Sequence, residues 1–204
     1  MNEHKAYHEQ PAPHPTALRL FHGISNCYGE ALAGQIAFDT PLSVTATGME
    51  KAAWVRHVTA ELEKRFPKDA VRSIMMACHC KDACRLEEMK TWLGGLYKES
   101  ASLDDFVDRV NRHDAGWFIR DGAVYTKFLW CECHMLTEVE SLPSQTWCHC
   151  TEGYTKALFE HVFGCEVESE LLQTIKTGHD FCLVKITPKT LKRSSRHALK
   201  RQRN

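Results

Sequence analysis

The segment Trp130–Cys150, WCECHMLTEVESLPSQTWCHC, constrains this chain more than any other part of it. It holds two Cys-x-Cys pairs, each with a histidine beside it: Cys131, Cys133 and His134, then Cys148, His149 and Cys150. Alternate side chains of a strand point to opposite faces, but at a strand end or in a loop both sulfurs of a pair can turn toward one point. We therefore expect the two pairs to meet at one site. Such a site suits a zinc ion, or else holds a reactive cysteine among polarising neighbours.

Charge is distributed unevenly along the 204 residues, although basic and acidic residues balance at 26 each. Residues 188–204 carry seven basic side chains and no acidic one, which leaves 1–187 with 19 basic and 26 acidic residues, a net charge of −7. We interpret 188–204 as a solvated basic tail. The acidic body gives no reason to expect nucleic acid as the partner.

Ten cysteines in a chain of this size could form disulfides, but the polar, proline-rich start, residues 1–16, is not typical of a secretory signal. We interpret it as a disordered lead-in and expect reduced cysteines in a cytoplasmic protein. No apolar run approaches the ~20 residues that span a bilayer, so no membrane is expected.

Residues 17–114 are predicted to be helical. Thr47 and Glu50 have capping-box spacing, and apolar residues then recur at helical intervals until Pro67: Ala52, Val55, Val58, Leu62 and Phe66. Asp69 is predicted to cap the next helix, and a later helix to break at Gly94-Gly95. Between these helices lies a possible second thiol group, Cys78, Cys80 and Cys84, for which ligand and core roles are equally weighted.

Residues 115–187 are predicted to form an antiparallel sheet and one helix in the order ββαββ. Asp121-Gly122 is typical of a type I′ hairpin turn, Thr151 is expected to cap a helix that ends at Gly164, and two strands follow. We therefore predict one α+β domain over 17–187, in which a helical N-terminal half packs on an antiparallel ββαββ sheet.

A run of residues in this half resembles a known family. Cys150-x-x-Gly153-Tyr154, Phe159, Phe163-Gly164, Val167-Glu168 and Gly178-x-x-x-Cys182 resemble the C-terminal part of the 4-vinyl reductase type domain. The run is similar as well to the L-2-amino-thiazoline-4-carboxylate hydrolase family, over about residues 115–187.

The resemblance implies an α/β domain with a buried small-molecule pocket. In the ligand-sensing relatives a zinc ion lies near that pocket, held by cysteines that include the one matching Cys182. This chain has Thr174 where those sensors have a further cysteine.

Three functions follow from these residues. The first is a metal-binding, small-molecule-binding domain, with zinc or another thiophilic ion held by cysteines drawn from Cys131, Cys133, Cys148, Cys150 and Cys182. Its hydrolytic form would use Glu132 or Glu152 as general base. The second is a metal-independent hydrolase of a small C–N or C–S substrate, with candidate catalytic residues Cys148, Cys150, His149 and Glu152. The third is a thiol-based redox or soft-metal sensor. A homodimer is left open.

Overall fold

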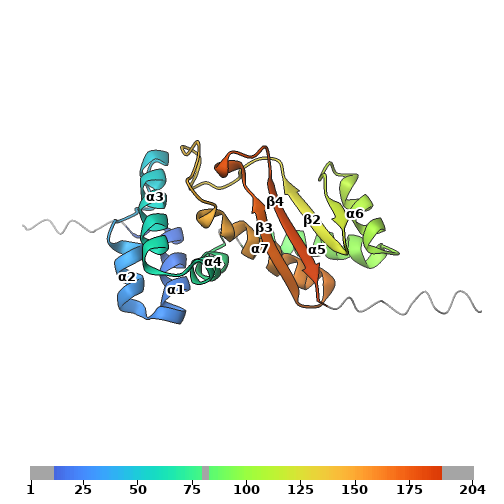
Figure 1. Ribbon diagram of the computed structural model, residues 1–204, viewed down its shortest axis with the longest axis horizontal. Coiled ribbons are helices and arrows are strands. Elements are labelled where there is room, and N and C mark those ends of the chain that lie inside the picture. Colours follow the sequence, from blue (N-terminus) through green and yellow to red (C-terminus); the bar gives the residue numbers. More distant parts are fainter. Residues whose placement is uncertain (1–11, 80–82, 190–204) are drawn as a thin grey trace, which may run out of the picture. The chain divides into compact units, whose positions relative to one another are not determined.

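The computed structural model describes residues 12–79 and 83–189, and Figure 1 shows its helices and strands. The chain divides into two compact units. Unit 1 consists of Met1–Cys80, Cys131–Cys150 and Lys176–Gly178, and unit 2 of Lys81–Trp130, Thr151–Ile175 and His179–Asn204. The predicted fold class is confirmed: the chain is α+β, with most helices in its first half and a four-stranded antiparallel sheet in its second.

Unit 1 is built mainly from four helices: α1 (Pro15–Tyr28), α2 (Glu30–Phe38), α3 (Gly48–Arg65) and α4 (Lys68–Ala77). The predicted capping box at α3 is confirmed, since the Glu50 N–H donates to the Thr47 hydroxyl (3.3 Å) and the Thr47 N–H to the Glu50 carboxylate (2.7 Å). The apolar stripe predicted from periodicity is buried along its whole length. This helix therefore forms where the sequence places it, with its apolar face in the core of unit 1.

Two predicted helix boundaries are wrong. Helix α4 begins at Lys68 with Pro67 as its N-cap, so Asp69 lies in the first turn. Its carboxylate is stabilised there by the positive end of the helix dipole. Helix α5 (Ala83–Glu99) runs through Gly94-Gly95 without a break. A glycine costs a helix interior only about 1 kcal/mol, and the second part of α5 is held by packing of the Tyr97 ring against Phe106.

Unit 2 contains the sheet, with strand order β1-β2-β4-β3. Its strands are β1 (Phe118–Arg120), β2 (Ala123–Phe128), β3 (Val167–Gln173) and β4 (Cys182–Pro188), all paired antiparallel. The predicted hairpin is confirmed, because Asp121 and Gly122 have φ of 52° and 75°, as a type I′ turn requires. The predicted order of two strands, a helix and two strands is thus the order observed.

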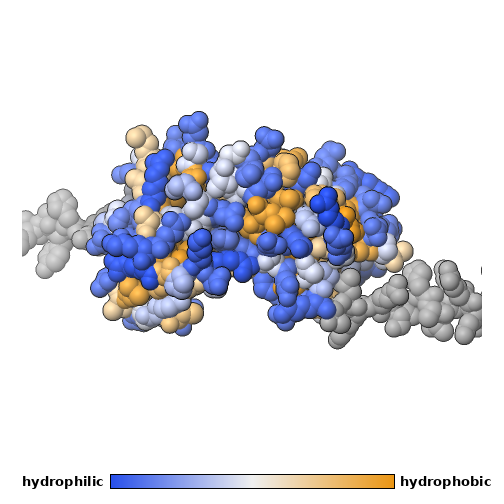
Figure 2. Space-filling model, viewed as in Figure 1, coloured by the Kyte–Doolittle hydropathy of each residue, from blue (hydrophilic) through white to orange (hydrophobic). Residues whose placement is uncertain are grey.

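One face of this sheet carries the core of unit 2. Alternate residues of the strands are buried there, among them Val124, Val184 and Ile186, and α7 (His149–Phe163) lies behind the sheet in Figure 1. The opposite face is mixed: the Phe118 ring stacks on Tyr125, and Figure 2 shows hydrophobic residues at the surface over β3 and β4. Helix α6 (Leu103–Asn111) completes the unit, and its N-cap is Ser102, whose hydroxyl accepts the Asp105 N–H.

Within the described ranges, no helix has the length and apolar character that crossing a bilayer requires.

The capping box yields a stability prediction. Thr47→Ala removes the acceptor for the Glu50 N–H, and we expect it to lower the free energy of unfolding by about 1 kcal/mol, measured as a lower urea midpoint at unchanged slope. Arg56→Ala, at an exposed position of the same helix, is the control and should stay within about 0.5 kcal/mol of the parent. Equal losses in both variants would contradict the prediction.

Candidate functional site

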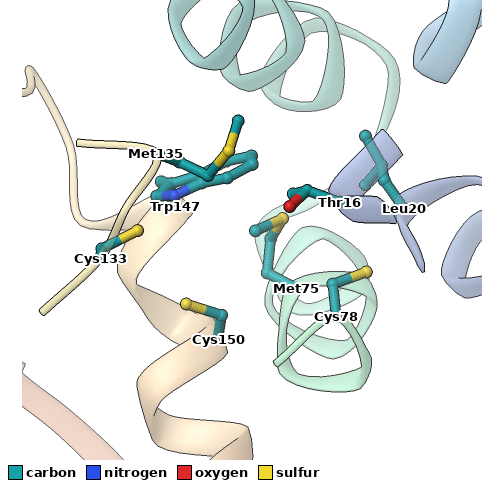
Figure 3. A pocket seen from close by; sticks show the side chains of 8 residues that line it. All are labelled: Thr16, Leu20, Met75, Cys78, Cys133, Met135, Trp147 and Cys150. Atoms are coloured by element: carbon teal, nitrogen blue, oxygen red, sulfur yellow. The ribbon is translucent and has the colours of Figure 1, made fainter. Parts of the chain in front are cut away.

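A small cavity lies inside unit 1, and Figure 3 shows the side chains around it. Its volume is about 10 Å³, room for one water-sized body. The lining residues are Thr16, Leu20, Met75, Cys78, Cys133, Met135, Trp147 and Cys150. Five of these eight residues carry sulfur, so the cavity offers soft donors in apolar surroundings.

Two helices supply one side of the cavity. Thr16 and Leu20 are four residues apart on α1 and therefore share a face. Met75 is buried on α4, and Cys78 is the C-cap of the same helix, with its N–H donating to the Met75 carbonyl at 3.1 Å. The end of α4 thus contributes Met75 and Cys78 to the cavity.

The segment 131–145 supplies the other side without regular secondary structure. It buries the apolar side chains of Met135, Leu136, Val139 and Leu142. Its backbone is tied down by turns and by Lys176, whose ammonium donates to the Val139 carbonyl and whose own carbonyl accepts the Leu142 N–H. The Glu63 carboxylate on α3 also accepts both the Ser144 and the Thr146 hydroxyls, each at 2.6 Å. These contacts hold the segment from Val139 onward, and nearer its start the Leu136 N–H donates to the Cys133 carbonyl at 2.9 Å.

Cys150 reaches the cavity from the first turn of α7. We predicted Thr151 as the helix cap, and this is wrong: a 3-10 turn, η1 (Thr146–Cys148), runs directly into α7, which begins at His149. The N-cap of this turn is Gln145, which makes no side-chain capping bond, and the Ser144 hydroxyl accepts the Thr146 N–H at 3.4 Å. The consequence is chemical, because a thiolate in the first turn of a helix is stabilised by the positive end of the helix dipole.

Trp147 closes the cavity with a buried indole. It is 4% exposed and packs edge-to-face against Trp54, with ring centroids 5.8 Å apart. Its Nε1 is buried and has no hydrogen-bond acceptor among the described residues. The nitrogen lies on the ring edge that faces Cys133 and Cys150 in Figure 3. The cavity therefore has one unused donor beside two thiol groups.

Cys78 differs from the other two cysteines of the cavity. Burial raises the pKa of its thiol to about 12, and its Sγ lies 3.5 Å from the Arg19 carbonyl. Its sulfur also leaves no room for a larger residue at Gly23, where a Cβ would come within 2.7 Å of it. Cys78 is thus a neutral thiol packed between α1 and α4, which matches the core role that the sequence left open.

The sequence-predicted thiol groups are only partly brought together. Cys133 and Cys150, one from each Cys-x-Cys pair, line the same cavity, and Cys78 of the second thiol group joins them. Cys131 is half-buried and Cys148 is buried, both in unit 1 but not in the cavity wall. Cys84 is exposed and belongs to unit 2, and Cys80 lies outside the described residues.

The predicted catalytic residues do not converge on one helix face. Cys150 and Glu152 are two residues apart on α7, a spacing that turns side chains to different sides. Glu152 is fully buried in unit 2, where its carboxylate accepts the Ser169 hydroxyl of β3 at 3.0 Å. Cys148 and His149 belong to unit 1. The helix therefore separates the carboxylate from the thiols it was expected to assist, and Glu132 is exposed.

The surroundings of Cys182 bear on the zinc site that the resemblance implies. Its Sγ accepts the Ile175 N–H at 3.3 Å, and Thr174 is fully buried. Within residues 12–79 and 83–189, no three or more His, Cys, Asp or Glu side chains are grouped to hold a metal ion. Cys182 is therefore not part of such a group in the described residues. The cavity in unit 1 is lined by three thiols and two thioethers, which are donors of the kind that thiophilic ions prefer.

A histidine of the segment 131–145, His134, stacks on a histidine at the start of α1, His14. The rings of His14 and His134 stack with centroids 5.8 Å apart. His14 is the N-cap of α1, and its Nδ1 accepts the Thr16 N–H at 3.1 Å. Burial, followed by the nearby charges of Lys51, His134 and Arg19, lowers the pKa of His14. The cap thus depends on a neutral imidazole.

The sequence analysis did not identify the two methionines or the Trp147 N–H as part of this cavity. A usable signal was present: Met75 and Met135 each lie within three residues of a cavity cysteine, in MMAC and CHM. Thioethers next to thiols in sequence are a pattern worth weighing as soft donors.

The raised pKa of Cys78 yields a reactivity prediction. Iodoacetamide at mildly alkaline pH should leave Cys78 unmodified in the folded protein, since its thiol is buried and protonated, while the exposed Cys27 is alkylated. Peptide mass spectrometry after timed quenching measures both sites. Alkylation of Cys78 at the rate of Cys27 would contradict the packing described, and alkylation of both after denaturation is the control.

The lowered pKa of His14 yields a pH prediction. Its neutral form is favoured in the folded chain, so the stabilisation is present above the ordinary histidine pKa of 6.5 and is lost as pH falls through the lower folded-state pKa. His14→Asn replaces the capping nitrogen by a side-chain oxygen that does not titrate, and we expect a shallower fall in the free energy of unfolding over that window. His179→Asn, at an exposed position, should keep the parent slope. An unchanged slope in His14→Asn would refute the assignment.

Comparison with known proteins gives one match. A model for a family of unknown function, DUF6144, matches residues 17–193, which is most of the chain. No curated protein and no solved structure matches this sequence. The match covers the helices of unit 1, the segment 131–145 and the whole sheet. The chain therefore belongs to the DUF6144 family.

Proposed function

We propose that this protein binds a thiophilic metal ion, of the class that includes zinc and copper(I), at the cavity of unit 1, with Cys133 and Cys150 as ligands. The observation that carries the proposal is that one cysteine from each Cys-x-Cys pair lines the same small cavity. These two residues come from different segments, a loop and the first turn of α7, so their meeting is a property of the fold.

Two further features support thiolates at this place. Cys150 lies in the first turn of α7, where the helix dipole favours a negative charge. The buried Trp147 N–H can donate a hydrogen bond to a metal-bound thiolate, and hydrogen bonds of this kind orient and stabilise metal ligands. Each thiol that binds the ion loses its proton, so affinity rises with pH.

The hydrolase alternative has less support. The Glu152 carboxylate, the general base expected beside the thiols, is held by the Ser169 hydroxyl within unit 2. The small-molecule ligand that the resemblance implies is a separate proposal and concerns unit 2, where Cys182 and Thr174 lie.

Elemental analysis tests the proposal. Protein purified without added metal, or reloaded after chelation, should contain one thiophilic ion per chain, and Cys133→Ser and Cys150→Ser should lose it. The matched controls are Cys27→Ser and Cys165→Ser, which alter an exposed and a half-buried cysteine away from the cavity and should keep the ion. A parent protein that neither contains nor takes up such an ion would refute the proposal. So would retention of the ion by both cavity variants.

A further inference from the structure

The cavity in unit 1 offers sulfur donors of two kinds. Beside Cys133 and Cys150 lie the thioethers of Met75 and Met135, both buried. In Figure 3 the sulfur of Met75 lies on the far side of the cavity from the two thiols. Thioethers bind soft ions such as copper(I), whereas structural zinc sites are built from thiolate, imidazole and carboxylate. The mixture of thiols and thioethers therefore favours copper(I) over zinc.

Charge points in the same direction. A monovalent ion between two thiolates leaves one negative charge, which an apolar cavity tolerates only if donors and dipoles stabilise it. Two such groups are present: the Trp147 N–H, which has no acceptor among the described residues, and the N-terminal end of α7 at Cys150. A divalent ion between the same thiolates would form a neutral site, which depends less on these two groups.

The third constraint is size. A cavity of about 10 Å³ accepts one water-sized body, which suits a bare ion better than a hydrated ion or an organic ligand. Thr16, the remaining polar residue of the lining, already accepts a hydrogen bond from the Arg19 guanidinium at 3.2 Å. The ion must therefore shed its water and take sulfur ligands in exchange.

From these observations we infer that the cavity is a copper(I) site, with the thiolates of Cys133 and Cys150 as ligands, the thioethers of Met75 and Met135 as supporting donors, and the Trp147 N–H donating to a bound thiolate. This rests on the proposed function and specifies its metal. Binding releases the proton of each thiol to solvent and involves no change in the oxidation state of copper.

The test is an anaerobic titration of the chelated, reduced full-length protein with copper(I), in competition with the chromophoric chelator bathocuproine disulfonate. We expect one copper(I) per chain, with thiolate-to-copper charge-transfer absorption, and no displacement by excess zinc. Met75→Leu and Met135→Leu keep the apolar volume but remove the thioether. Trp147→Phe keeps a ring but removes the N–H. Each should weaken copper(I) binding at least about tenfold.

Controls separate this inference from the function on which it rests. Met49→Leu, at a position 77% exposed, should bind as the parent does, and thermal unfolding of every apo variant identifies losses that come from misfolding. Zinc that displaces copper(I), or methionine variants that fold and bind copper(I) as tightly as the parent, would overturn the copper(I) assignment and leave the metal site standing. Failure to bind either metal would overturn both.

Discussion

The burial of an irregular segment is the constraint on which unit 1 depends. Residues 131–145 form no helix or strand, yet they place Leu136, Val139 and Leu142 in the core. A buried chain without regular structure must still satisfy its backbone polar groups. Here that is achieved by tight turns and by Lys176, which contributes both its ammonium and its carbonyl. Without these tethers the two Cys-x-Cys pairs would not be held near the helices.

The two buried tryptophans show how the site differs from an ordinary core. Trp54 and Trp147 meet edge-to-face, a favourable arrangement for aromatic rings. Yet neither indole nitrogen has an acceptor among the described residues. A buried donor left unsatisfied costs about 1–3 kcal/mol. Unit 1 has both unsatisfied donors, and one of them, the Trp147 N–H, belongs to a residue that lines the sulfur-rich cavity.

The sequence predicts this fold where the signals are local. The capping box at Thr47 and the turn at Asp121-Gly122 each depend on residues within four positions of one another, and both form as expected. Helix ends were harder to place. Helix α7 starts directly after the 3-10 turn Thr146–Cys148, which the helix pattern does not reveal. The second part of α5 packs through Tyr97 against Phe106 of a different helix.

The candidate site was predictable only in part, for the same reason. The Cys-x-Cys spacing identifies the segment that carries the thiols, but the selection of Cys133 over Cys131 and of Cys150 over Cys148 depends on local backbone direction. That Cys78 lines the same cavity is a tertiary contact with no local signal. The separation of Cys150 from Glu152 follows from α7 beginning at His149, which places both residues on a helix.

Unit 1 is assembled from three stretches of chain that are far apart in sequence, and this has a consequence for biosynthesis. A ribosome delivers α1 to α4 first, with Leu20 and Met75 still lacking the side chains that cover them. Met135, Trp147 and Lys176 emerge only after much of unit 2 has been made. Because domains usually fold during synthesis from the N-terminus, the apolar faces of these helices must stay uncovered for that interval. The core of unit 1 can therefore be completed only after Lys176 has been synthesised.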